Sequence, residues 1–160
     1  MKKLRKEQQG FTLIELLVVI GILALLLAIT LIAINPNKHF QDTRNAKRSS
    51  DVLAILDSIY EYEAGNTGTI PSSLASVSTN SGSPSPIASS GAGFVNPCTD
   101  LVPTYLADLP IDPGSGTKSA ATACAGTYST GYTIYKSATS GRFTVTAPSA
   151  EDGASISVTR

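Results

Sequence analysis

The sequence predicts an α+β protein in which one long N-terminal helix packs on a small antiparallel β-meander. Three observations lead to this prediction: an apolar run at residues 11–34, a helical spacing of apolar residues before position 65, and short alternating segments near the C-terminus. We divide the chain into a short basic segment (1–10), a transmembrane helix (11–34), an amphipathic helix half (35–64) and a globular region (65–160).

Charge is unevenly distributed along the chain. The 160 residues include 12 basic and 12 acidic side chains. The first ten residues contain four of the basic side chains: Lys2, Lys3, Arg5 and Lys6. Without residues 1–10 the chain would keep 8 basic and 11 acidic groups, and this slightly acidic balance does not favour a nucleic-acid partner.

Residues 11–34 are long and apolar enough to cross a membrane. Of these 24 residues 20 are apolar, and at 1.5 Å per residue the helix would be about 36 Å long. No A-x-A cleavage site follows, so we interpret the segment as a retained anchor rather than an export signal. Asn35 precedes Pro36, and we expect a bend or a melted turn there.

The basic N-terminal segment favours a cytoplasmic N-terminus by the positive-inside rule. Basic residues also follow the apolar run closely: Lys38, Arg44, Lys47 and Arg48. The cysteines and the abundance of Ser and Thr favour an external C-terminal region. We therefore predict a single-pass protein of the cell membrane with its N-terminus inside and its globular region outside.

Glu15 is the only charged residue in the apolar run, and no residue of opposite charge lies within that run. A carboxylate in hydrocarbon is costly, so such groups are usually functional or paired. The alternative is that Glu15 lies close enough to the membrane interface to reach water.

The run Gly10-Phe11-Thr12-Leu13-Ile14-Glu15, between a Lys/Arg-rich leader and a long apolar tract, resembles the type IV pilin and pseudopilin family. The resemblance implies that a prepilin peptidase cuts after Gly10 and that the new N-terminal residue, Phe11, is N-methylated. It also implies that Glu15 of an incoming subunit meets the Phe11 amine of a subunit already in the filament. Without the resemblance, Gly10 would be a flexible link before the helix.

The resemblance continues beyond the anchor in a second helical segment at residues 37–64, and many pilins have a proline in this long helix. Residues with helical spacing predict one apolar face: Val52, Leu56, Ile59 and Tyr60. We expect the helix to end at Gly65.

The basic residues at the start of this helix are Arg44, Lys47 and Arg48. We interpret them as a solvated face paired with Asp42 and Asp51 at helical spacing. The alternative is contact with DNA or with anionic headgroups.

The globular region is predicted to begin with a long exposed loop at 76–93, because its Ser-rich composition buries little apolar surface. Residues 101–114 resemble the Leu-Pro-x-Asp-Pro segment that precedes the sheet in pilins. Three strands are predicted at 131–135, 142–147 and 154–159, joined by turns at 136–141 and 148–153.

Cys98 and Cys124 do not form a CxxC pair, and His39 is the only histidine, so no zinc site is predicted. We predict a disulfide between the two cysteines, which implies an oxidising compartment. The alternative is two unrelated buried thiols.

No catalytic constellation or phosphate-binding loop is present in the sequence, and we predict no enzymatic activity. Calcium is the one cofactor that the sequence leaves open. Its candidate ligands are Asp108, Asp112, Glu151 and Asp152, and the alternative is that these are ordinary turn and surface acids.

The resemblance implies a structural subunit of a type IV pilus that serves adhesion, motility or DNA uptake. Its partners would be copies of itself, other pilins, the prepilin peptidase, and the assembly platform with its ATPases. A pseudopilin of a type II secretion system is the alternative within the same fold. A single-span membrane-anchored receptor or enzyme is the alternative from another class.

Overall fold

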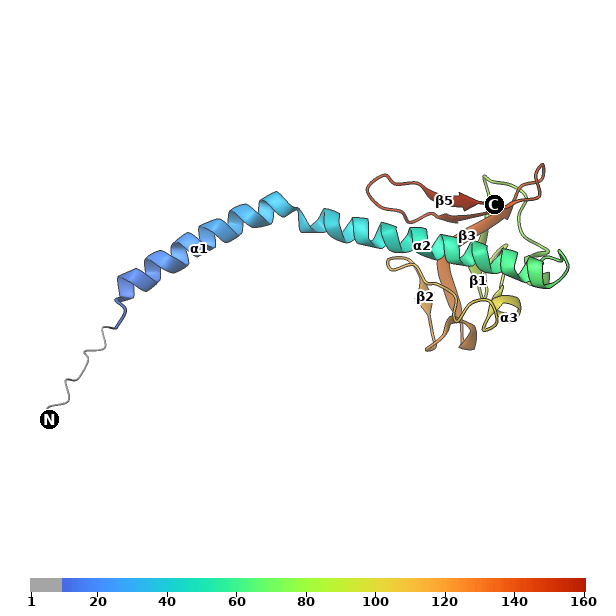
Figure 1. Ribbon diagram of the computed structural model, residues 1–160, viewed down its shortest axis with the longest axis horizontal. Coiled ribbons are helices and arrows are strands. Elements are labelled where there is room, and N and C mark those ends of the chain that lie inside the picture. The colour runs from blue at the N-terminus through green and yellow to red at the C-terminus, as the bar shows by residue number, and fades with distance from the viewer. Residues whose placement is uncertain (1–9) are drawn as a thin grey trace, which may run out of the picture. The chain divides into compact units, whose positions relative to one another are not determined.

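The computed structural model describes residues 10–160, and the predicted leader lies outside the described residues except for Gly10. The chain forms two units, Met1–His39 and Phe40–Arg160. The first contains the apolar helix, and the second contains the sheet (Figure 1). The α+β fold that the sequence predicts is confirmed.

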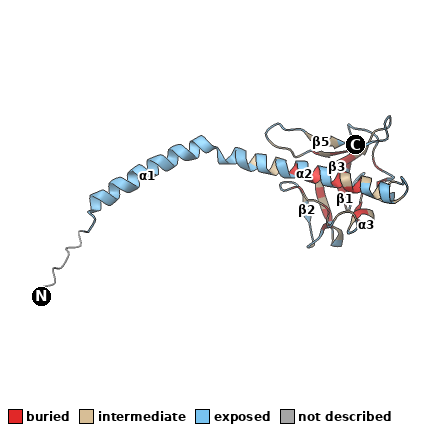
Figure 2. Cartoon of the chain, viewed as in Figure 1, coloured by how far each residue is buried: buried red, intermediate tan, exposed pale blue. Residues whose placement is uncertain are grey.

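The apolar run forms helix α1, Leu13–Ile34. None of its residues is buried within the chain, and Figure 2 shows it exposed along its length. Among the described residues, Leu13–Gly65 is the one helical stretch long and apolar enough to cross a membrane. A helix that is apolar on all sides is stable only when something outside it covers its surface, such as a bilayer or other helices.

The helical path is interrupted at Asn35, where a bend or a melted turn was expected. Asn35 ends α1 with a left-handed φ of 44°, and helix α2, Pro36–Gly65, begins at the proline. Proline is well placed at the start of a helix because it has no N–H to leave unpaired there. Helix α2 ends at the predicted Gly65.

The predicted apolar face of α2 packs into the core of the globular unit. Figure 2 shows in red the part of α2 that is buried there. Val52, Leu56 and Ile59 are at most 1% exposed. Ile55, which was not among the predicted residues, is also fully buried, whereas Tyr60 is only half-buried. The sheet residues of the same core include Tyr132, Ile134, Phe143 and Val145.

The sheet has five strands: β1 (Ser85–Ala88), β2 (Thr117–Lys118), β3 (Tyr128–Lys136), β4 (Phe143–Ala147) and β5 (Ile156–Thr159). Their order is β1-β3-β4-β5, all neighbours are antiparallel, and β2 pairs with the start of β3. Strands β3 to β5 form the predicted meander, although β3 begins before the predicted position. Three short helical segments complete the unit: η1 (Ser72–Leu74), α3 (Cys98–Leu101) and η2 (Ala123–Ala125).

The prediction of an exposed loop at 76–93 is wrong in part. The segment contains β1, which pairs with β3 and brings Ile87 to 1% exposure. The Ala88 N–H also donates to the Val95 carbonyl at 3.0 Å. Composition averaged over many residues does not reveal individual apolar side chains, here Ile87 and Ala88, whose burial depends on pairing with a distant strand.

Candidate functional site at the start of α1

The first turn of α1 is closed by a capping box between Thr12 and Glu15. The Thr12 hydroxyl accepts from the Glu15 backbone N–H at 3.3 Å. Glu15 Oε2 in turn accepts from the Thr12 backbone N–H at 2.8 Å and from the Thr12 hydroxyl at 2.7 Å. This reciprocal bonding satisfies backbone donors that a helix start otherwise leaves free.

Glu15 therefore has a partner within its own chain, which the sequence analysis missed. Thr12 is neutral, so a comparison of charges along the apolar run does not identify it as the partner. The Thr-x-x-Glu spacing was the signal that could have revealed the contact.

The two residues before the capping box are open to the surroundings. Gly10 and Phe11 are exposed, with Phe11 at 89%, and a Cβ built on Gly10 would meet nothing within 4 Å. The peptide bond between them is therefore accessible. This arrangement places an accessible bond directly before a capped apolar helix whose first turn contains a carboxylate.

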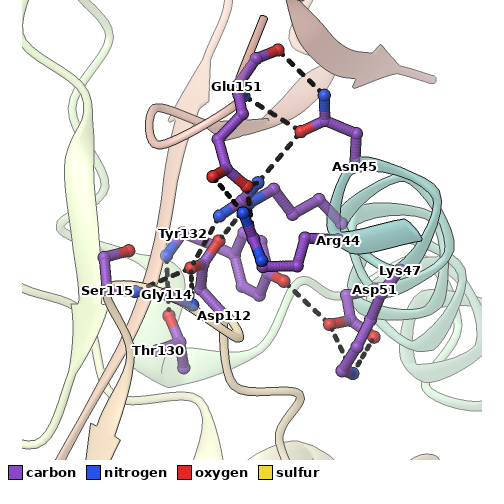
Figure 3. A network of polar contacts seen from close by, with 11 residues as sticks. Arg44, Asn45, Lys47, Asp51, Asp112, Gly114, Ser115, Thr130, Tyr132 and Glu151 are labelled. Carbon is purple, nitrogen blue, oxygen red and sulfur yellow. Dashed lines mark hydrogen bonds and ion pairs between the residues drawn. The ribbon is translucent and has the colours of Figure 1, made fainter. Parts of the chain in front are cut away.

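A second polar cluster lies in the globular unit, where Figure 3 shows Asn45 of α2 beside Glu151. Arg48 of α2 is at its centre, because it bonds to Asn45, Asp112 and Glu151. The Arg48 side chain is 2% exposed. Its Nε and Nη2 donate to the Asp112 carboxylate at 2.6 and 3.3 Å, and its Nη1 donates to Glu151 at 2.8 Å and to Asn45 Oδ1 at 2.9 Å. The cluster joins α2 to the segment before β2 and to the turn between β4 and β5.

Asp112 is held by its own loop as well as by the arginine. The backbone N–H groups of Gly114 and Ser115 each donate to its carboxylate at 2.8 Å. Gly131 allows this loop to approach β3, because it has a φ of 80° and an added Cβ would lie 2.8 Å from the Asp112 Cβ. A residue with a side chain would therefore push the loop away.

The hydrogen bonds of this cluster keep the ionisable groups of Arg48, Asp112 and Glu151 charged. Burial raises the pKa of Asp112, but hydrogen bonds from Arg48, Ser115 and Gly114 outweigh it and hold the pKa at about 2. Hydrogen bonds from Arg44 and then Arg48 lower the pKa of Glu151 to about 2. The hydrogen bond to Asp112 raises the pKa of Arg48 further above its ordinary value. Groups that stay charged at neutral pH suit a structural ion network better than proton transfer.

The interpretation of Arg44, Lys47 and Arg48 as one solvated face is wrong for two of them. Lys47 does pair with Asp51 at 2.8 Å as predicted. Arg44 instead binds Glu151 at 2.6 Å, and Arg48 is buried. Their partners lie more than 60 residues away in the sequence, so helical spacing could not identify them.

The four calcium candidates do not come together in the structure. Asp112 and Glu151 share Arg48, whereas Asp108 accepts from the Ala123 N–H at 2.9 Å and lies 3.6 Å from Lys118. Within residues 10–160, no group of three or more His, Cys, Asp or Glu side chains is placed to hold a metal ion. Asp112 and Glu151 therefore bind a common cation, the Arg48 guanidinium group, which lies between their carboxylates.

Cys98 and Cys124 form a disulfide, the pairing that the sequence analysis expected. Their Cα atoms are 5.5 Å apart, and their sequence separation is 26. The bond joins α3 to η2, and the loop that it closes contains Asp112.

Comparison with known proteins gives one finding. The family model described as the prokaryotic N-terminal methylation motif matches residues 5–31, which include Gly10, Phe11, the capping box and most of α1. No curated protein and no solved structure matches the chain. The chain thus carries at its N-terminus the prepilin signal of the type IV pilins and pseudopilins.

Proposed function

We propose that this protein is a structural subunit of a type IV pilus. One observation carries the proposal: the methylation motif at residues 5–31 coincides with an apolar helix that has no buried residue within its own chain. Such a helix needs an apolar environment from outside. A bilayer covers it before assembly, and helices of other copies cover it in the filament.

The proposed sequence of events begins at the accessible bond between Gly10 and Phe11. A prepilin peptidase cleaves this bond, and the new amine of Phe11 is N-methylated. Glu15 of an incoming subunit then meets the Phe11 amine of a subunit already in the filament. Because a buried charge without its partner is strongly destabilising, this contact sets the register of assembly, while apolar packing supplies most of the association energy.

We also propose that the N-terminus faces the cytoplasm and that the globular unit lies outside the cell membrane. The disulfide between Cys98 and Cys124 supports this orientation, because such bonds persist in oxidising compartments. The partners in this scheme are other copies of the chain, other pilins, the peptidase, and the assembly platform with its ATPases. On the surface the filament would serve adhesion, motility or DNA uptake.

The test is to produce the full chain in a host that has a prepilin peptidase and a pilus assembly machine. Mass spectrometry of the mature protein should find a chain that begins at N-methylated Phe11. Immunogold electron microscopy with antibodies against the globular unit should label surface filaments.

Filaments that retain the leader, or a processed protein that never polymerises, would contradict the proposal. Processed protein without surface filaments, together with loss of protein secretion when its gene is deleted, would indicate a pseudopilus instead.

A further inference from the structure

The polar side chains of α1 and its N-cap are few, and the helix itself satisfies most of their hydrogen bonds. The Thr30 hydroxyl donates to the Leu27 carbonyl at 2.9 Å. The Thr12 hydroxyl both donates to and accepts from Glu15. Thr12 donates two hydrogen bonds, one from its backbone N–H and one from its hydroxyl, and both end on Oε2 of Glu15. Within the described residues, Oε1 of Glu15 is left without a hydrogen-bond partner.

The capping box does not depend on the leader. Its atoms belong to Thr12 and Glu15, whereas the bond proposed for cleavage lies between Gly10 and Phe11. Cleavage therefore removes no atom of the box. It creates a cationic amine on Phe11, the residue directly before the N-cap.

We propose that Thr12 is a positioning residue for filament assembly. It holds Oε2 of Glu15 in the capping box, so that Oε1 accepts the Phe11 amine of a second copy of this chain. This inference rests on the proposed function and assigns a task to a residue beside the charge pair.

Two physical effects support this task. A side chain already held in one rotamer loses less conformational freedom when its partner binds, so the contact forms more readily. Polar groups without partners are costly in hydrocarbon, and the two bonds from Thr12 satisfy half of the carboxylate before assembly.

The test compares filament assembly among three variants of Thr12 in the full chain. Assembly is scored as the fraction of processed subunits found in filaments at early times. Thr12→Val, which lacks the hydroxyl, should assemble roughly tenfold more slowly, about the effect of losing one hydrogen bond to a charged group. Thr12→Ser, which keeps the hydroxyl, should assemble within about twofold of the unchanged chain.

Thr12→Gly separates positioning from simple helix capping. Glycine is nearly as good as threonine at an N-cap but has no hydroxyl. If Thr12 positions Glu15, the glycine variant should assemble as slowly as the valine variant. If Thr12 serves only to cap α1, the glycine variant should assemble normally, and the inference would be overturned.

Thr30→Val is the matched control. It removes a hydroxyl from the same helix, but that hydroxyl bonds to Leu27 and not to Glu15. Assembly of this variant should be unchanged, and an equal loss would overturn the inference. A Thr12→Val chain that the peptidase does not process would also overturn it, because Thr12 would then belong to the cleavage site.

Glu15→Val distinguishes this inference from the proposed function. If Glu15→Val assembles normally, the charge pair of the proposed function fails. If Glu15→Val fails to assemble while Thr12→Val assembles at the normal rate, only the role of Thr12 fails.

Discussion

Helix α1 and the globular unit differ in how their side chains are buried and hydrogen-bonded. All of α1 is exposed within the chain, whereas the globular unit buries a core that includes Val52, Ile55, Tyr132 and Phe143. In the described part of the chain, every buried side-chain nitrogen and oxygen has a hydrogen-bond partner. Within residues 10–160 the Oε1 atom of Glu15 in α1 has none, and Glu15 is exposed.

The two regions therefore obtain their stability from different sources. The globular unit obtains it from its own core, its ion network and its disulfide. Helix α1 has no buried residue within the chain, so its apolar contacts come from outside it, and under the proposed function its sequence acts on assembly rather than on folding. Substitutions in the two regions should therefore produce different phenotypes, and the four predictions below test this separation.

The largest effect is expected for Glu15→Val. The variant should remain in the membrane and be processed, but the rate of filament assembly should fall roughly a hundredfold, because the Phe11 amine loses its partner. Quantitative electron microscopy of filaments measures the rate. The unfolding midpoint of the globular unit should not change. Normal filaments, or a less stable globular unit, would break the separation between the regions.

The second prediction concerns Arg48→Ala. Removal of the buried guanidinium leaves Asp112 without its cation and should lower the free energy of unfolding by about 3–5 kcal/mol. All six tyrosines lie between Tyr60 and Tyr135, so tyrosine fluorescence during denaturation of the full chain in detergent reports on the globular unit alone.

Lys47→Ala is the control for Arg48→Ala. The Lys47 side chain is half exposed and pairs with Asp51 across one helical turn, so its loss should change stability by at most about 0.5 kcal/mol. Equal effects of the two substitutions would show that the burial of Arg48 does not matter.

The third prediction concerns the disulfide. Its loop of 26 residues should contribute about 3 kcal/mol to the stability of the globular unit, because the bond restricts the unfolded chain. Reductant, or the double substitution of Cys98 and Cys124 by Ala, should lower the unfolding midpoint. The helicity of α1 in detergent, followed by far-ultraviolet circular dichroism above that midpoint, should persist. Simultaneous loss of both signals would indicate that the two regions unfold together.

The smallest effect is expected from mild acid. The folded pKa values of Asp112 and Glu151 are about 2, below their ordinary values of 3.8 and 4.5. A lowered pKa stabilises the fold fully above the ordinary value, and this contribution is lost as the pH falls toward the folded value. The unfolding free energy should therefore be constant near neutral pH and decline between about pH 5 and pH 2.

Glu151→Gln checks the source of this decline, because glutamine cannot titrate. Its unfolding free energy should fall less steeply with acid than that of the unchanged chain. An identical slope would mean that other groups cause the acid sensitivity.

Much of the fold follows from local patterns that the sequence shows directly. The apolar run predicted α1, the spacing of Val52, Leu56 and Ile59 predicted the buried face of α2, and alternation near the C-terminus predicted the meander of β3 to β5. The candidate site could also be predicted from a local pattern, because Gly10, Phe11 and Glu15 lie together at the start of the apolar run. Only Thr12 was missed there, although its spacing to Glu15 was visible.

Residues within a few turns of one another thus specify the apolar helix, the methylation signal and the helical and strand segments, and such local patterns are visible in the sequence. Tertiary structure alone decided that β1 completes the sheet and that Arg48 is buried between Asp112 and Glu151. The physical reason is that the arginine's partners lie 64 and 103 residues away. Whether a charged side chain on a helix is solvated or buried depends on the groups that the completed fold brings close to it. The spacing of residues within the helix does not identify those groups.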